Sequence, residues 1–229
     1  MILYLAIPLT LAVYFLAQWF YKKTALAIFN PILLSIGALI SIMLTFGFEL
    51  EEYQQGTNIL TRLLEPAVIA LAFPLFQQFV HVKAKIVPIL IACSVGVIVG
   101  LVVTTFVAIS FSASPEIVAS LAPKAVTTPI AMAISHTIGG IPAISAIMVI
   151  MVGIFGNVCA PFLLKHLRIR TPEAQGLAIG SGSHVIGTSK AMELSRTHGA
   201  FSTTALLISA VLTSVIAPVL YPYLLIWML

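Results

Sequence analysis

The sequence predicts an all-α polytopic membrane protein, with about six full spans plus two interrupted or re-entrant elements arranged as an inverted repeat. The first observation is composition: the 229 residues are 60% hydrophobic and 8% charged, with no Asp and a mean hydropathy of +1.14. The second is that several uncharged runs exceed the roughly 20 residues that cross a bilayer. The third is a pair of polar stretches between those runs. We expect a single membrane domain over residues 1–229.

The two polar stretches, 122–140 and 176–199, resemble each other. Both contain hydroxyl side chains, lysine, histidine and glycine, which cannot face lipid without partners inside the protein. An offset of 60 residues aligns Thr128 with Thr188, Ser135 with Ser195, Thr137 with Thr197 and Gly139 with Gly199. We therefore expect two copies of one unit, 114–164 and 171–229, each a polar, interrupted element followed by an apolar helix.

Residues 1–112 are expected to form N-terminal spans, a scaffold plus one span that is broken by proline. The expected spans cover residues 2–20, 25–48, 59–80 and 86–111. Lys22 and Lys23 close the first of them. An acidic loop over 49–58, ending in a Gly-Thr-Asn turn, separates the second from the third.

The third span is unusual because it contains charges and prolines. Arg62 and Glu65 lie three positions apart near its start, and Pro66 and Pro74 lie within it. The simplest interpretation is an ion pair between Arg62 and Glu65 at the membrane interface. The alternative is that Glu65 takes part in coupling transport to an ion.

Each repeat unit opens with the same signal for a helix start. Ser114-Pro115-Glu116 and Thr171-Pro172-Glu173 place an N-cap residue, a proline at the first helical position and an acid at the positive end of the dipole. In the first unit Pro123 and Pro129 exclude regular helix between them. In the second unit we expect glycines to make the break: Gly180, Gly182 and Gly187. Apolar spans over 143–164 and 200–229 complete the two units.

Charge distribution favours re-entrant hairpins over broken crossing helices. If residues 117–138 enter and return, segments 81–85, 165–173 and 196–199 fall on one side together with Lys22 and Lys23. The positive-inside rule assigns that side to the cytoplasm. The termini, the 49–58 loop and Glu116 then face outward, and the two hairpin tips, 123–128 and 183–188, meet across one site.

The tips suggest a binding site for a small anion, because half-helix ends offer unpaired N–H groups and positive dipole ends. The candidate substrate-binding residues are Lys124, Thr127, Thr128, Ser183, His184, Gly187 and Thr188. One cation with several hydroxyls suits a small hydroxy- or keto-carboxylate. The alternatives are that Lys124 snorkels or pairs with Glu116, that Thr127 and Thr128 cap a helix, and that His184 bonds a carbonyl.

The remaining polar residues and the cysteines suggest structural roles. Lys190 and Glu193, three positions apart, are candidates for coupling, although an internal ion pair is the favoured interpretation. His136 and His198 near element ends are expected to be structural. Cys93 and Cys159 lie in apolar runs and are expected to pack as free thiols.

Neither a metal-ligand spacing nor a catalytic set is evident, so we expect no cofactor and no enzymatic activity. The net charge of +4 is scattered through short loops, which does not suggest nucleic acid.

Three stretches resemble the LrgB/CidB membrane-protein family: PEIVASLAPKAVTTPIAMAI, GLAIGSGSHVIGTSKAMELSRTHGAFS and LLEPAVIALAFPLFQQ. The chain is also similar to the C-terminal domain of the plant plastidal glycolate/glycerate translocator. The resemblance implies a multi-pass protein of the bacterial inner (cytoplasmic) membrane. It also implies a small LrgA/CidA-type membrane protein as partner. A homo-oligomer, with a dimer favoured, is expected as well.

Two functions follow from this resemblance and from the polar units. The first is a transporter of small monocarboxylates of the glycolate, glycerate, pyruvate or lactate type, working by alternating access and coupled to protons if His184 or Glu193 titrates. The second is an antiholin-like regulator of murein hydrolase activity and cell lysis. A pore component would need polar faces on continuous spans, whereas 86–111 and 200–229 are expected to be apolar all round. We therefore favour the transporter.

Overall fold

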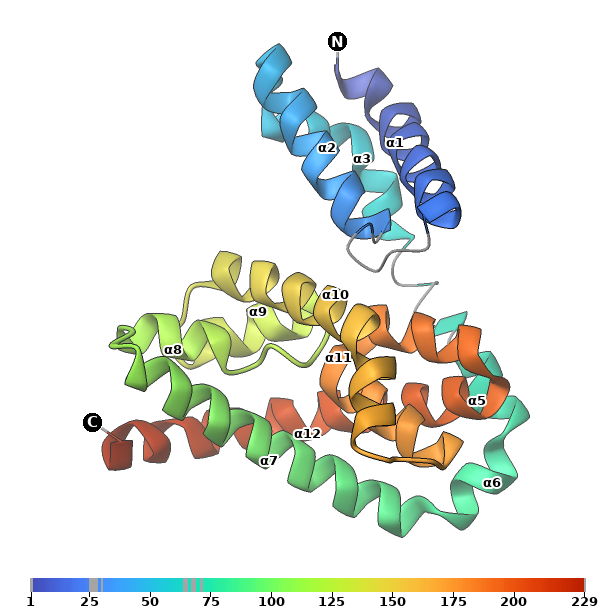
Figure 1. The fold of residues 1–229 in the computed structure, drawn as a ribbon. Helices are drawn as coiled ribbons and strands as arrows, with labels where there is room; N and C mark the ends of the chain where they lie inside the picture. The colour runs from blue at the N-terminus through green and yellow to red at the C-terminus, as the bar shows by residue number, and fades with distance from the viewer. Residues whose placement is uncertain are drawn as a thin grey trace. The chain divides into compact units, whose positions relative to one another are not determined.

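The structure is a computed structural model that describes residues 2–24, 29, 31–63, 66, 69–70 and 72–228. Within these ranges every regular element is a helix, which confirms the all-α prediction (Figure 1). The helices are α1 (Ile2–Thr24), α2 (Pro31–Phe46), α3 (Leu50–Arg62), α5 (Ala72–Gln77), α6 (Phe79–Ala84), α7 (Ile86–Ser110), α8 (Pro115–Leu121), α9 (Thr128–Thr137), α10 (Pro142–His166), α11 (Pro172–Leu194) and α12 (Arg196–Met228).

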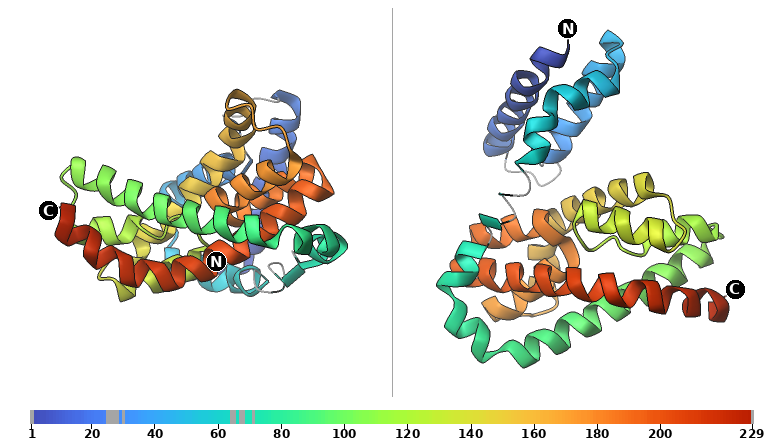
Figure 2. Two further views of the ribbon diagram at one scale, coloured as in Figure 1. Left: turned by 90° about the horizontal axis from the view of Figure 1, so that it is seen from below. Right: turned by 180° about the vertical axis from the view of Figure 1, so that it is seen from behind.

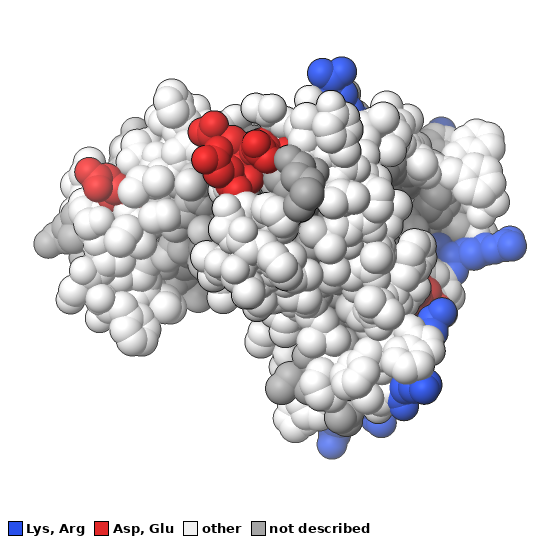
Figure 3. Space-filling model, turned by 90° about the horizontal axis from the view of Figure 1, so that it is seen from above, with Lys and Arg blue, Asp and Glu red and all other residues white. Residues whose placement is uncertain are grey.

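Four of the described helices are long and apolar enough to cross a membrane. They cover Leu3–Thr24, Ile86–Ser110, Pro142–His166 and Arg196–Trp227. The expected span over 25–48 corresponds to the shorter apolar helix α2, Pro31–Phe46. The surface supports a membrane location, since uncharged atoms cover most of the face that Figure 3 shows. Many large apolar side chains are exposed, which suits contact with lipid tails.

The chain divides into two compact units, Met1–Leu71 and Ala72–Leu229. In the first unit α1 packs against both α2 and α3. Gly56 of α3 lies against the backbone of Leu3, where a Cβ would overlap the Leu3 carbonyl oxygen. The hydroxyls of Thr10 and Tyr53 form a hydrogen bond of 2.7 Å between α1 and α3.

The expected loop over 49–58 was wrong, because residues 50–58 belong to α3. Glu51 and Glu52 occupy its first turn, where acids favour the helix dipole. Gly56 was interpreted as a turn residue. It lies inside the helix instead, because the missing side chain lets α3 approach α1 closely.

The span expected over 59–80, with a break caused by proline, is interrupted at other places in the described residues. Helix α3 ends at Arg62, and α5 and α6 are separated at Gln78, whose dihedral angles (φ −109°, ψ 13°) are not helical. Pro74 falls in the first turn of α5, where no backbone donor is needed, so it lies near the start of a helix. Glu65, the residue proposed for an ion pair or for coupling, lies outside the described residues.

In the second unit α11 packs mainly against α12 and α10, and α7 packs along α12 (Figure 2). Helices α8 and α9 contact α7, α10 and α12. An apolar core surrounds them and includes Leu101, Val118, Val126, Val149 and Tyr221. The two interrupted segments therefore pack against the long helices of this unit.

The two interrupted segments begin at opposite ends of α7. Helix α8 follows the end of α7, and the Tyr221 hydroxyl near the end of α12 donates to the Pro115 carbonyl over 2.7 Å. Helix α11 begins beside the start of α7, where Lys85 pairs with Glu173 at 2.8 Å. Since α7 has 25 residues, its ends are about 37 Å apart.

Helix α12 was expected to be apolar all round beyond residue 200, and this was wrong. It buries a row of hydroxyl side chains: Ser202, Thr203, Thr204, Ser209 and Thr213. Several of them bond carbonyls one turn back, as Thr213 does with the Ser209 carbonyl at 2.6 Å. Such hydroxyls leave the hydropathy of a helix high, which is why the span was read as purely apolar.

Candidate functional site

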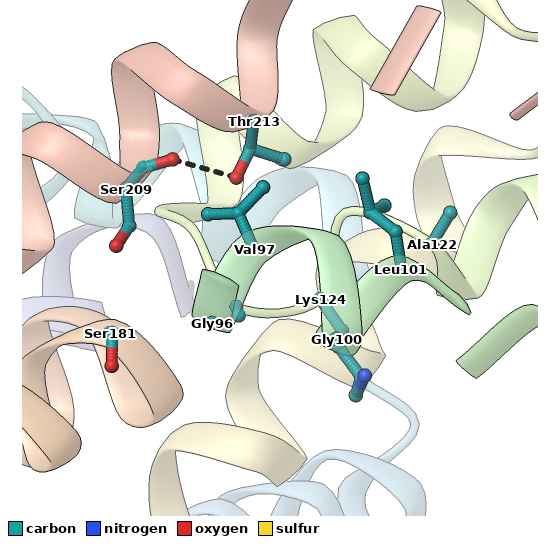
Figure 4. A pocket seen from close by; sticks show the side chains of 10 residues that line it. Gly96, Val97, Gly100, Leu101, Ala122, Lys124, Ser181, Ser209 and Thr213 are labelled. Atoms are coloured by element: carbon teal, nitrogen blue, oxygen red, sulfur yellow. Dashed lines mark hydrogen bonds between the residues drawn. The ribbon is translucent and has the colours of Figure 1, made fainter. Parts of the chain in front are cut away.

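A pocket lies where the break between α8 and α9 meets α7, α11 and α12. Residues 122–127 are not helical, and Pro123 and Pro129 flank Lys124 as the sequence predicts. The pocket is lined by Gly96, Val97, Gly100, Leu101, Ala122, Lys124, Ala125, Ser181, Ser209 and Thr213 (Figure 4). Its empty space, counted out to the surrounding solvent, is about 310 Å³. This mixture of polar and apolar lining residues suits a small, partly polar molecule.

Lys124 is the charged residue of this pocket. Its Nζ donates to Thr104 Oγ1 on α7, and the Thr104 hydroxyl donates in turn to the Gly100 carbonyl at 2.6 Å. No carboxylate of the described residues pairs with Lys124, and an ion pair with Glu116 is absent there. The ammonium is therefore held inside the helical unit by a neutral hydroxyl, which leaves its charge available to an anion.

The pocket also contains hydroxyls from two other helices. Ser181 of α11 donates to the Leu177 carbonyl at 2.8 Å, and Thr213 of α12 donates to the Ser209 carbonyl at 2.6 Å. The Ser209 hydroxyl is buried beside the Cys93 thiol of α7. A Cβ at Gly96 would lie 4.0 Å from Ser181 Oγ, so α7 and α11 approach each other here because the glycine has no side chain.

The break in the second polar stretch is made by His184, and the expected glycine break was wrong. Helix α11 is helical on both sides of His184, whose φ of 43° and ψ of −140° are not helical. Its ring Nε2 donates to the Val149 carbonyl of α10 at 2.7 Å. Gly153 leaves space for the ring, since a Cβ there would lie 2.5 Å from the ring. This contact with α10 holds a backbone conformation that a non-glycine residue rarely adopts.

The other residues proposed at this tip pack against neighbouring helices. Ser183 lies against Gly156 of α10, where a Cβ would overlap the serine. Thr188 donates to the His184 carbonyl at 2.8 Å and is 2.9 Å from Ser202 Oγ on α12, so the Ser202 hydroxyl is the donor of that second bond. Gly187 is buried against Ser183. The four residues of this tip, 183, 184, 187 and 188, do not line the pocket in the described part of the chain.

Thr127 and Thr128 lie at the start of α9 and are half-buried. Thr127 is the N-cap residue, yet its side chain makes no capping hydrogen bond. Neither threonine is among the described residues that line the pocket. The structure thus brings Lys124 of the first repeat unit together with Ser181 of the second repeat unit, and not with segment 183–188.

The coupling candidates Lys190 and Glu193 form an ion pair of 2.8 Å. The side chain of Glu193 is 67% exposed, so this pair belongs to the surface of the unit. The predicted ion pair is confirmed, although it was expected to be internal, and a role of the two residues in coupling stays a prediction.

A polar network at the start of α11 gives His198 the structural role expected of it. His198 bonds Gln175 at 2.9 Å and Ser195 at 2.8 Å, while Gln175 donates to the Ile169 carbonyl. Nearby, the hydrogen bond from Lys85 holds the pKa of Glu173 below its ordinary value. This ion pair is therefore intact above the ordinary pKa of a glutamate and is lost as the pH falls through the lowered one. His136, by contrast, is exposed.

Sequence reasoning missed Thr104, the hydrogen-bond partner of Lys124, and several residues that line the pocket: Gly96, Gly100, Ser181, Ser209 and Thr213. A signal for them exists. Gly96, Gly100 and Thr104 recur every four residues, as do Ser209 and Thr213, so each set occupies one helix face. Small residues at this spacing are typical of close helix contacts in membranes.

Comparison with known proteins identifies the family. The model of the LrgB-like family matches residues 10–223. The chain belongs to the LrgB family. It is 34% identical over 215 residues to the uncharacterized protein YwbG of Bacillus subtilis, a match that covers 94% of this chain and 96% of the relative.

Other relatives of similar length include proteins with a holin-like name. The chain is 35% identical to the uncharacterized protein YxaC of Bacillus subtilis, over 93% of this chain and 92% of the relative. It is 29% identical to the holin-like protein CidB of Staphylococcus aureus, over 94% of both chains. No solved structure matches the chain. The family and the apolar helices together establish a membrane protein of the LrgB/CidB type.

Proposed function

We propose that this LrgB-family protein transports small monocarboxylates of the glycolate, glycerate, pyruvate or lactate type across the bacterial inner membrane. The observation that carries the proposal is the Lys124 ammonium, which lines a pocket inside the helical unit with Thr104 as its hydrogen-bond partner. Charged groups within membrane segments are costly and commonly mark the path of a substrate. A monoanion would neutralise this charge.

The proposed binding step exchanges one partner of Lys124 for another. In the structure the ammonium donates to a neutral hydroxyl. A carboxylate entering the pocket would accept a charge-assisted hydrogen bond, which is about twice as strong as a neutral one. Because one cation lines the pocket in the described residues, a monocarboxylate balances the site and a dicarboxylate leaves a buried negative charge unpaired.

Alternating access is the mechanism that this arrangement favours. Helices α8 and α9 begin and end near one end of α7, and α11 begins near the other. We propose that the units 114–164 and 171–229 are inverted repeats whose interrupted elements enter from opposite faces, as in other secondary transporters. His184 is the candidate for proton coupling, because it is the titratable side chain at the break of α11.

Uptake into proteoliposomes tests this proposal. Vesicles containing the purified protein should accumulate radiolabelled glycolate, glycerate, pyruvate or lactate above the level of protein-free vesicles. The matched variants are Lys124→Gln, which should abolish specific uptake, and Lys190→Gln, which removes a surface lysine outside the pocket and should retain it. Equal uptake by Lys124→Gln and by the unchanged protein would contradict the role of the pocket.

The second candidate function is an antiholin-like or holin-like role in cell lysis, which the name of the CidB relative favours. A pore would release solutes of unrelated chemistry. Leakage of an entrapped neutral dye from the same proteoliposomes would support this alternative, whereas a carrier should retain the dye while it takes up labelled acid.

The proposal extends to partners and assembly. We propose that the protein acts without enzymatic chemistry, together with a small LrgA/CidA-type membrane protein, and that it forms a homo-oligomer, with a dimer favoured. Uptake by the chain alone and by the chain co-reconstituted with such a partner would distinguish an independent carrier from one that requires a second subunit.

A further inference from the structure

The end of α10 carries positive charges that have no counter-ion in the described part of the chain. Lys165 lies in the last turn of α10, Arg168 and Arg170 lie in the loop that follows, and all three are exposed. Glu173, the next acid along the chain, is already paired with Lys85 at 2.8 Å. Among the described residues no carboxylate pairs with the three cations, so their charge is left for a partner outside the chain.

Arg168 occupies a backbone position at which glycine is usual. Its φ is 58°, in the left-handed region. The Ile169 N–H donates to the Leu164 carbonyl at 3.0 Å, and the Arg168 N–H donates to the Lys165 carbonyl at 3.1 Å. These are the two hydrogen bonds of a Schellman motif, in which glycine adopts the left-handed conformation without the steric cost of a side chain. An arginine is therefore present where glycine would fold more easily, which favours a role for its side chain outside the fold.

This end of α10 has the length and the side chains of a segment at the membrane interface. The helix has 25 residues and is about 37 Å long, more than the roughly 30 Å of the hydrocarbon core of a bilayer. Phe162, Leu163 and Leu167 are exposed at this end, beside the cations. Exposed apolar side chains next to Lys and Arg suit the interface, since the apolar groups contact acyl chains and the cations reach phosphate groups.

We propose that segment 165–170 binds the phosphate groups of anionic phospholipids in the leaflet that surrounds this end of α10. Arginine matches phosphate with paired hydrogen bonds, and each basic residue near an anionic membrane surface adds to the attraction. The positive-inside rule also accounts for basic residues in a loop. That rule concerns insertion of the chain, however, and requires neither an arginine in the left-handed conformation nor an effect of lipid charge on the folded protein.

The experiment measures thermal unfolding of the full chain in two kinds of nanodisc. One contains phosphatidylcholine alone, and the other contains equal parts of phosphatidylcholine and phosphatidylglycerol. The unchanged protein should melt about 5 °C higher in the anionic nanodiscs, because a lipid that binds the folded state stabilises it. Arg168→Gln combined with Arg170→Gln should lose more than half of this gain. Lysine at both positions, which keeps the charges, should retain most of it.

Lys85→Gln combined with Lys190→Gln is the matched control. It removes the same number of charges from the same compact unit, but these two lysines are already paired with Glu173 and Glu193. The control should keep most of the gain from anionic lipid, even if the loss of two ion pairs lowers its melting temperature in both lipids. An equal loss of the gain in the two glutamine variants would mean that the lipid responds to net charge alone, and would overturn the proposal.

Arg168→Gly separates lipid binding from a structural role of the arginine. In phosphatidylcholine nanodiscs this variant should melt at the temperature of the unchanged protein or above it, because glycine relieves the left-handed conformation. In anionic nanodiscs its gain should be smaller than that of the unchanged protein. A lower melting temperature in both lipids with the full gain retained would show that Arg168 serves the fold, and would overturn the proposal. The variant also provides the test if the double glutamine variant does not fold.

Inorganic phosphate identifies the source of the phosphate group. Added to phosphatidylcholine nanodiscs, it should not reproduce the gain, because a free anion has no acyl chains to contact the exposed apolar side chains of this end. Equal stabilisation by inorganic phosphate would assign the segment to a soluble anion and overturn binding of lipid. Equal melting of the unchanged protein in the two kinds of nanodisc would overturn it as well. Neither result bears on the carrier proposal, which depends on uptake and on Lys124.

Discussion

At the scale of single residues, the Lys124 ammonium has the Thr104 hydroxyl as its partner, and that hydroxyl is already committed to the Gly100 carbonyl. A neutral oxygen compensates a buried positive charge less well than a carboxylate does. We propose that this cation is retained for an anion that arrives from outside. This is the physical reason for treating Lys124 as the anchor of a substrate anion and not as a packing residue.

We predict that Lys124→Gln weakens binding of the transported acid by ~1.5–3 kcal/mol, the scale of a hydrogen bond to a charged group. Calorimetry on protein in nanodiscs measures the change. Lys190→Gln is the control, because Lys190 pairs with Glu193 at the surface. Unchanged affinity in a folded Lys124→Gln protein would show that the lysine serves the structure alone.

A second prediction concerns Thr188, which the sequence assigned to the substrate. Its hydroxyl links the His184 carbonyl to Ser202, so Thr188→Val should lower the free energy of unfolding by ~1–3 kcal/mol and leave acid affinity unchanged. In a double-mutant cycle with Ser202→Ala, the stability effects should fail to add by at least ~0.5 kcal/mol. A large loss of acid affinity with normal stability would return Thr188 to the binding site.

At the scale of helices, α11 packs closely between α10 and α12 because glycines at the contacts have no side chains. Gly176 and Gly180 face the α12 backbone, and Gly153 and Gly156 of α10 leave space for His184 and Ser183. Buried hydrogen bonds from His184 and Thr188 add to these contacts. Close approach with polar links is how helices associate where lipid removes the hydrophobic driving force.

Two glycines of α11 make this packing testable. A Cβ at Gly180 would overlap the Ser202 carbonyl, whereas a Cβ at Gly182 meets nothing within 4 Å. We predict that Gly180→Ala lowers the free energy of unfolding by ~1–3 kcal/mol through overpacking. Gly182→Ala should be neutral or should stabilise by up to ~1 kcal/mol, because alanine favours helix. Thermal unfolding in detergent measures both. Equal effects of the two variants would mean that α11 and α12 are not in close contact.

The helices and breaks were predictable to different degrees from the sequence, and the difference has physical causes. The break around Lys124 follows from two prolines, since proline excludes regular helix through local geometry. The break at His184 depends on a carbonyl of α10, a tertiary contact that local sequence does not record. The same holds for Gly56, which reads as a turn residue but serves close packing against Leu3. The small residues of α7 and the hydroxyls of α12 at the pocket recur every four residues in the sequence, but the high hydropathy of both helices concealed them.

At the scale of the whole compact unit Ala72–Leu229, the positions of the helix ends indicate how the chain is oriented in the membrane. The Lys85–Glu173 pair joins the start of α7 to the start of α11, and Gln175 bonds Ile169 after the end of α10. Ser114, by contrast, follows the far end of α7, where Tyr221 bonds Pro115. The basic residues around 83–85 and 165–170 therefore gather at one end of the long helices. The positive-inside rule places such an end in the cytoplasm.

This arrangement leads to a labelling prediction in spheroplasts, with Cys93 and Cys159 replaced by alanine. Single cysteines at Ala84 and Leu167 should react with a membrane-impermeant maleimide only after the membrane is opened, because both positions belong to the basic end. A cysteine at Ser114, which is exposed and makes no capping bond, should react from outside. The three sites control for one another, since a reagent that leaks inward labels all of them. If positions 84 and 167 label from opposite sides, residues 117–138 cross the membrane as a broken helix. The interrupted elements would then not enter from opposite faces, and alternating access would need another structural basis.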